Sequence, residues 1–73
     1  MSYIHFVDAG TSKSGLTKIW YVKSVAGTAL GTISWHAPWR RYCFTPAVNT
    51  LFDAECLIDI TNFLTLEMDN HAR

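Results

Sequence analysis

Hydrophobic and polar residues alternate with a period of two through most of the first 45 positions. Such alternation is typical of strands that are buried on one face. Four segments share it and are rich in β-branched and aromatic residues: Tyr3–Val7, Lys18–Val25, Ala29–Trp35 and Trp39–Thr45. Between them, positions 8–17 are dense in Gly, Ser and Thr, and positions 26–28 include a glycine. These stretches predict loops, so the first part of the chain predicts a small antiparallel sheet of about four strands.

The period of the pattern changes after Pro46. Apolar residues now recur at the three- and four-residue steps of a helix: Phe52, Cys56, Leu57, Ile60, Phe63, Leu64 and Met68. We expect Asn49 or Thr50 to cap this helix and Asp53 to lie in its first turn, close to the positive end of the helix dipole. The helix is predicted to end near Met68, with residues 69–73 frayed. Residues 1–73 are thus predicted to form a single α+β domain, ββββα, with one C-terminal amphipathic helix.

One helix does not provide enough cover for such a sheet. About 18 helical residues span ~27 Å, which covers one sheet face. Both faces of the second to fourth predicted strands carry aromatic or other apolar residues. A bare apolar face is a site of association, so we expect a homo-oligomer. A ligand or a partner protein is the alternative cover.

Composition and charge narrow the function classes. The chain has 73 residues, for which a compact fold exposes roughly 4,600 Å². Six basic and six acidic residues give no net charge, and a nonspecific nucleic-acid binder normally carries a basic excess. No apolar run approaches the ~20 residues of a membrane span, and Ser2, His5 and Asp8 interrupt any signal peptide. We therefore expect a cytoplasmic protein in which Cys43 and Cys56 are reduced and buried.

The candidate catalytic groups do not form a convincing set. The loop Gly10–Gly15 has the glycine spacing of a phosphate-binding loop, but Leu16 stands where its lysine belongs and a strand follows. A hairpin loop is expected there, and a looser phosphate contact through Lys13 stays open. Cys43 is the only nucleophile with possible bases, His36 or His5, and a thiol in the middle of a strand is usually inert.

Metal ligands are equally scattered. Histidines and cysteines occur at positions 5, 36, 43, 56 and 71, without the paired spacing of a zinc site. We therefore predict a non-catalytic protein with neither a metal nor a cofactor.

One eight-residue segment concentrates groups that bind ligands. It holds two indoles, an imidazole, two guanidiniums and a phenol, which are the side chains Trp35, His36, Trp39, Arg40, Arg41 and Tyr42. Indoles stack on planar rings, and guanidinium forks match phosphate. A phosphate-bearing nucleotide-type ligand is the predicted occupant, with Arg40 in the pocket because it shares strand parity with Tyr42. The alternative is that the tryptophans form a cross-strand pair capping the core while the arginines pair with helix acids.

At this hairpin the sequence resembles a family of short uncharacterised proteins of bacteriophages and mobile elements. The shared stretch runs as Leu30-Gly31-x-Ile33-x-Trp35-x-x-Trp39-Arg40-x-Tyr42-x-Phe44-x-Pro46, followed by the apolar helix pattern Cys56-Leu57-x-x-Ile60-x-x-Phe63. The resemblance covers about residues 3–64. It implies a phage or mobile-element origin and assigns no chemistry.

In that setting a small accessory protein is expected to act as a counter-defence factor in the bacterial host cell. Two mechanisms follow as hypotheses. In the first, the protein sequesters a nucleotide-type ligand at the aromatic and arginine hairpin. In the second, it inhibits a host defence protein by docking its exposed aromatic sheet face, as anti-CRISPR proteins do. A structural or regulatory role in the phage is a third possibility.

Overall fold

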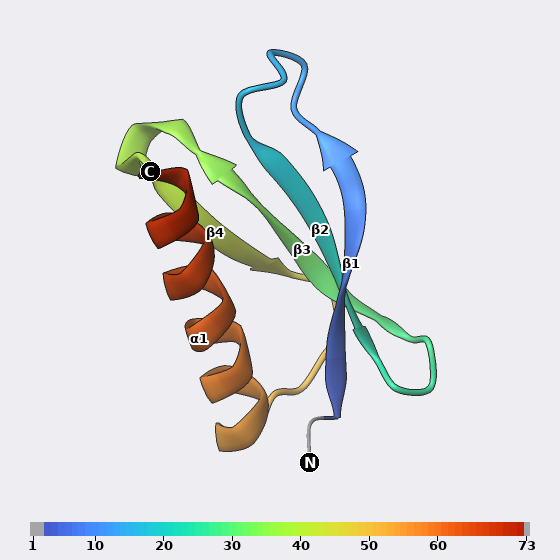
Figure 1. Cartoon of the computed structure of the whole chain (residues 1–73). Coiled ribbons are helices and arrows are strands. Elements are labelled where there is room, and N and C mark those ends of the chain that lie inside the picture. The colour runs from blue at the N-terminus through green and yellow to red at the C-terminus, as the bar shows by residue number, and fades with distance from the viewer. Residues whose placement is uncertain (1–2, 73) are drawn as a thin grey trace.

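The structure, a computed structural model, describes residues 3–72 and shows the predicted ββββα arrangement (Figure 1). Its elements are β1 (Ile4–Thr11), β2 (Lys18–Ser24), β3 (Ala29–His36), the 3-10 turn η1 (Ala37–Trp39), β4 (Arg41–Pro46) and α1 (Ala54–His71). The strands form one antiparallel sheet in the order β1-β2-β3-β4, so each strand pairs with its neighbour in sequence. The α+β fold class is thereby confirmed.

Side chains on the sheet alternate between the side covered by α1 and the side away from it. Trp20 pairs with Ile33, and Ile33 pairs with Phe44. Because paired residues project to the same side, these three side chains share one face. Ile33 and Trp20 are buried, so theirs is the covered face. The opposite one is the open face, and Tyr21 on it is 47% exposed.

The core is small and lies between the covered face and α1. It consists of Ile4, Trp20, Val22, Ile33, Tyr42 and Ile60. The ring of Phe63 joins helix to sheet, since it stacks on Phe6 at 4.0 Å and meets Trp20 edge-on at 5.0 Å. The helical stripe predicted to face the sheet is largely correct, except that Leu57 is 50% exposed.

The first strand is longer than predicted. β1 continues to Thr11, although a loop was expected from position 8. A bulge between Asp8 and Thr11 makes the extension possible: Gly10 takes φ +100°, and its N–H donates to Asp8 Oδ1 at 2.8 Å. Glycine tolerates this backbone without a steric penalty. Gly10, which was interpreted as a sign of a loop, therefore allows the strand to continue.

The helix begins later than predicted. Asp53 is its N-cap, and its Oδ1 accepts a hydrogen bond from the Cys56 N–H at 2.9 Å. This hydrogen bond lowers the pKa of the Asp53 carboxyl from its ordinary value near 3.8. The two expected caps form a turn instead: Asn49 has φ +59°, and Thr50 Oγ1 donates to the Ala47 carbonyl.

The end of the helix also differs from the prediction. α1 continues for three residues past Met68, to His71, with Ala72 as its C-cap. Of the predicted frayed segment, only Arg73 lies outside the described residues. Within residues 3–72 no helix combines the length and hydrophobicity that a membrane crossing needs.

Candidate binding site

A 3-10 turn lies within the predicted hairpin site and divides its residues between the end of β3, the turn itself and the start of β4. His36 ends β3, η1 follows, and Arg40 adopts the left-handed conformation with φ +54°. β4 therefore begins at Arg41 and not at Trp39. The prediction that Arg40 follows the strand alternation of Tyr42 is wrong, because Arg40 lies outside the strand.

Two of the predicted ligand-binding residues face the helix. Tyr42 is buried, and its Oη accepts a hydrogen bond from the Lys18 N–H at 3.2 Å. Trp35 packs edge-on against the Tyr42 ring at 5.2 Å. Tyr42 thus contributes to the core, whereas Trp35 is only partly buried and keeps surface available for contact.

The other predicted residues form an exposed tip. Trp39 is 66% exposed, and its ring meets His36 edge-on at 4.9 Å. Arg41 Nε donates to the Trp39 carbonyl at 3.3 Å. Arg40 and Arg41 are both exposed.

Trp35 instead borders a hollow that the sequence did not indicate. This loop–helix pocket has a volume of about 380 Å³ and lies where the β1–β2 loop meets the end of α1. Figure 1 shows that loop and the C-terminal end of α1 at the same end of the molecule. The pocket is lined by Ser12, Ser14, Leu16, Thr17, Trp35 and His71. The Gly10–Gly15 loop, proposed as a separate phosphate contact, thus shares a hollow with one of the hairpin tryptophans.

The rings of the pocket come from β3 and from the last helical turn. His71 lies against Trp35 with ring centroids 4.4 Å apart and a 36° tilt. His71 was predicted to lie in a frayed tail. The three- and four-residue steps from Ile60 through Leu64 and Met68 continue to His71, and extending the helical pattern to that position would have placed the imidazole on the sheet side.

The loop supplies hydroxyl groups. The Ser12 and Ser14 hydroxyl oxygens are 3.1 Å apart, and Ser14 Oγ also accepts from the Leu16 N–H at 3.3 Å. Whichever serine donates within the pair, one hydroxyl proton remains for a ligand. Lys13 lies between the two serines in sequence and is exposed, so a cation is available at the same loop.

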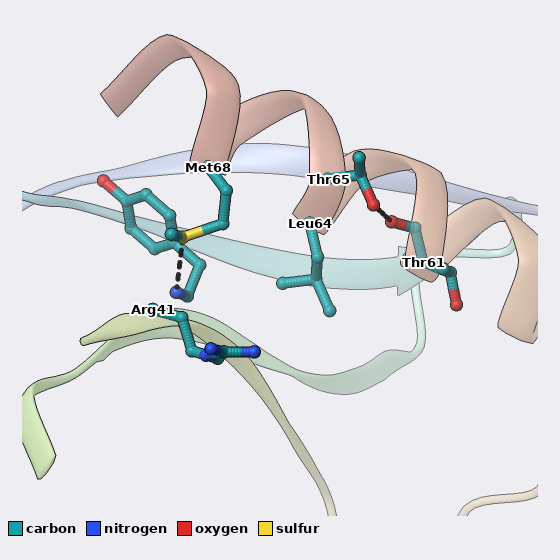
Figure 2. Close-up of a pocket in the computed structure, with 6 residues that line it drawn as sticks. Arg41, Thr61, Leu64, Thr65 and Met68 are labelled. Carbon is teal, nitrogen blue, oxygen red and sulfur yellow. Dashed lines mark hydrogen bonds between the residues drawn. The ribbon is translucent and has the colours of Figure 1, made fainter. Parts of the chain in front are cut away.

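A second hollow runs between β4 and α1 (Figure 2). This strand–helix groove measures about 450 Å³ and is lined by Arg41, Tyr42, Thr61, Leu64, Thr65 and Met68. Figure 2 shows Arg41 on the strand side and Leu64 and Met68 on the helix side. The Thr61 and Thr65 hydroxyls already donate to the carbonyls of Leu57 and Thr61.

The two hollows differ in the polar groups they leave available. In the strand–helix groove the threonine hydrogens are committed to the helix and Arg41 Nε is committed to Trp39, which leaves the four Nη hydrogens of Arg41 as donors. The Tyr42 N–H at its border is directed to Met68 Sδ at 3.2 Å. The loop–helix pocket combines an unused hydroxyl donor with the neighbouring rings of Trp35 and His71, so it is better suited to a polar, planar ligand.

The cysteines are both free, and they are partly buried where buried side chains were expected. Cys56 lies beside Asp53, and its hydrogen bond with that carboxylate raises the pKa of the thiol, which disfavours the nucleophilic thiolate. Cys43 Sγ donates to the Arg41 carbonyl at 3.8 Å, not to a histidine. Within residues 3–72, no three His, Cys, Asp or Glu side chains are grouped as metal ligands.

Comparison of the chain with models of known protein families, with curated proteins and with solved structures gives no match.

Proposed function

We propose that this chain is a non-catalytic binding protein that holds a phosphate-bearing, nucleotide-type ligand in its loop–helix pocket. The observation that carries the proposal is the convergence of the β1–β2 loop and Trp35 on one hollow of about 380 Å³. That volume lies within the roughly 300–1,000 Å³ of small-molecule sites. In the phage setting that the resemblance implies, the protein would sequester a nucleotide signal of the host cell.

The groups around the pocket support this ligand class. Trp35 and His71 offer planar surfaces for a base. The Ser12–Ser14 hydroxyl pair offers a donor to ribose or phosphate oxygens, and Lys13 offers a positive charge on the same loop. Of the predicted binding residues, Trp35 lines the pocket and Lys13 lies on the loop that borders it, and groups from the loop and the helix end take the place of the hairpin arginines.

Calorimetric titration against cyclic nucleotides, mononucleotides and ADP-ribose derivatives tests the proposal. At least one compound should bind more tightly than about 100 μM. Lys13→Ala should weaken that binding by roughly tenfold or more, since a charge-assisted contact contributes about 1.5–3 kcal/mol. His71→Ala removes a ring surface beside Trp35 and should weaken binding by roughly threefold to tenfold, since an aromatic pair contributes about 0.5–1.5 kcal/mol. Arg40→Ala is the control, because Arg40 is exposed at the hairpin tip and lies outside both the pocket lining and the β1–β2 loop that holds Lys13.

Two results would contradict the proposal. One is that no compound binds within the tested range. The other is that Arg40→Ala abolishes binding while Lys13→Ala and His71→Ala match the wild type, which would return the site to the hairpin tip.

A second candidate function rests on the tip itself. Trp39 is 66% exposed, and exposed tryptophan beside arginine is the composition of protein-binding hot spots. On this hypothesis the tip docks on a host defence protein and inhibits it. Phage infection of bacteria that carry defence systems separates the two functions: docking predicts that Trp39→Ala loses protection and Lys13→Ala keeps it, and ligand sequestration predicts the reverse.

A further inference from the structure

The open face of the sheet is divided into a bulky half and a small half. On β1 and β2 it carries Val7, Ile19 and Tyr21. On β3 and β4 its central positions carry only short side chains, namely Thr32, Ser34, Cys43 and Thr45. One row of paired residues crosses the whole face, from Val7 through Tyr21 and Thr32 to Thr45. The β1–β2 half of the face thus carries bulkier side chains than the β3–β4 half, and the two halves meet between β2 and β3.

This division makes the face complementary to a copy of itself. We propose that two copies of the chain pack through their open faces about a two-fold axis parallel to the strands, between β2 and β3. The rotation lays the β1–β2 half of each copy over the β3–β4 half of the other, so that Tyr21 of each copy meets Thr32 of the other. A two-fold axis across the strands would instead place the bulky halves on each other. Only the first arrangement sets the bulky side chains of one copy against the short side chains of the other, as close packing of two sheets requires.

The charges on the face agree with this orientation. No charged residue lies in the central rows, and the nearest basic residues are Lys23 at one border and Arg41 at the other. In the proposed dimer Lys23 lies over the end of the partner's β3–β4 half that holds Ala29 and Pro46. Lys23 is therefore kept away from the partner's Arg41, and the uncharged central rows of the two copies meet each other.

The area is sufficient for a weak dimer. Four strands about 4.8 Å apart and roughly seven residues long give a face of about 19 by 23 Å. Pairing two such faces removes on the order of 1,000 Å² from water, which is near the lower limit for a specific interface. The isolated chain exposes 5276 Å², more than the roughly 4,600 Å² expected of a compact chain of this size. Covering the open face would remove much of that excess, and for an interface of this size we expect a weak dimer that depends on concentration.

Sedimentation analysis from roughly 1 to 200 μM tests the dimer by mass action. The wild type should shift from one to two chain masses across this range. Tyr21→Thr sets a short side chain against a short one across the interface, and Thr32→Tyr sets a bulky side chain against a bulky one. Each should therefore weaken dimerisation by about tenfold or more. The double variant Tyr21→Thr with Thr32→Tyr exchanges the two halves of the pair and should recover most of the wild-type association.

Controls separate loss of contact from loss of fold. Asn62→Tyr places the same new ring on the exposed side of α1, away from the strand–helix groove, and should dimerise like the wild type. Thr32→Lys, which puts a charge in the centre of the face, should be monomeric while its circular dichroism stays that of the wild type. In a Cys56→Ala background, alkylation of Cys43 should slow as protein concentration rises.

The proposal is overturned if the wild type remains a monomer throughout the range. It is equally overturned if the folded double variant associates no better than the weaker single variant, or if Thr32→Lys dimerises normally.

Discussion

The two faces of the sheet are formed by the same four strands but differ in the size and burial of their side chains. The covered face gathers the large rings and the side chains that are wholly buried, including Val22 and Ile33 at 0% exposure. On the open face Ile19 and Tyr21 stay within reach of solvent, and Thr32 and Ser34 fill the neighbouring strand. Residues adjacent in sequence, such as Ile19 and Trp20, therefore contribute to different properties. We expect the covered face to determine the free energy of unfolding and the open face to determine association.

The largest difference in the free energy of unfolding should come from truncating an isoleucine on each face in turn. Ile33→Ala leaves a cavity in the fully buried core and should lower the free energy of unfolding by about 2–5 kcal/mol. Ile19→Ala on the open face should cost about 1 kcal/mol or less in the monomer. Urea denaturation of dilute samples measures both. Equal losses would show that the faces do not differ in the way proposed.

Two isoleucines of α1 allow the same comparison between a buried and an exposed position, with a smaller expected loss of stability. Ile60 is 4% exposed against the covered face, and Ile58 is 57% exposed on the outer side of α1. Ile60→Ala should cost about 2–4 kcal/mol, with Ile58→Ala near zero. A substantial loss from Ile58→Ala would mean that a further surface covers the outside of the helix.

Adding one carbon to the covered face should also destabilise the protein. A Cβ at Gly31 would lie 2.5 Å from both Phe44 Cε1 and the Thr45 carbonyl oxygen. Because the carbonyl belongs to the backbone and cannot move aside cheaply, Gly31→Ala should cost roughly 1–3 kcal/mol. Thr32→Ala, one residue along on the open face, is the matched control and should have little effect on thermal unfolding. A Gly31→Ala variant as stable as the wild type would contradict the tight packing of Phe44.

The smallest effect should come from the helix cap, and it should depend on pH. Hydrogen bonding from the Cys56 N–H lowers the pKa of Asp53 in the folded state. The stabilisation is therefore present above the ordinary pKa near 3.8 and is lost as the pH falls through the folded value. Asp53→Ala should melt at a lower temperature than the wild type at pH 7, and the gap should close in acid. A gap that stays constant with pH would show that the carboxylate is not the source.

The sequence pattern was sufficient to determine which side chains of a strand share a face of the sheet. The two-residue alternation placed Trp20 and Val22 on one side and Ile19 and Tyr21 on the other, as the structure has them. It did not locate the ends of the elements. Gly10 extends β1 through a bulge, and Asp53 caps the helix although Asn49 and Thr50 are also good caps, because local preference does not distinguish among several suitable residues in one turn.

The site was predicted less well, for two physical reasons. The left-handed backbone at Arg40 breaks the alternation, and arginine is not a residue whose type signals such a conformation. The loop–helix pocket joins the β1–β2 loop to His71, and this proximity arises only when the helix packs across the sheet. Sequence spacing showed which residue types were available, whereas tertiary packing decided which of them meet.

The order of the strands has a consequence for how the chain folds during synthesis. A meander with no crossover allows each hairpin to close as soon as its second strand is available, so the local contacts form early and quickly. The stack of Phe63 on Phe6 is different, since it connects the first strand to the last element. Until α1 has left the ribosome, Phe6, Trp20 and Tyr42 have no helix to cover them, and the nascent sheet exposes its aromatic side to other chains. The helix is thus made after the strands whose aromatic side it covers.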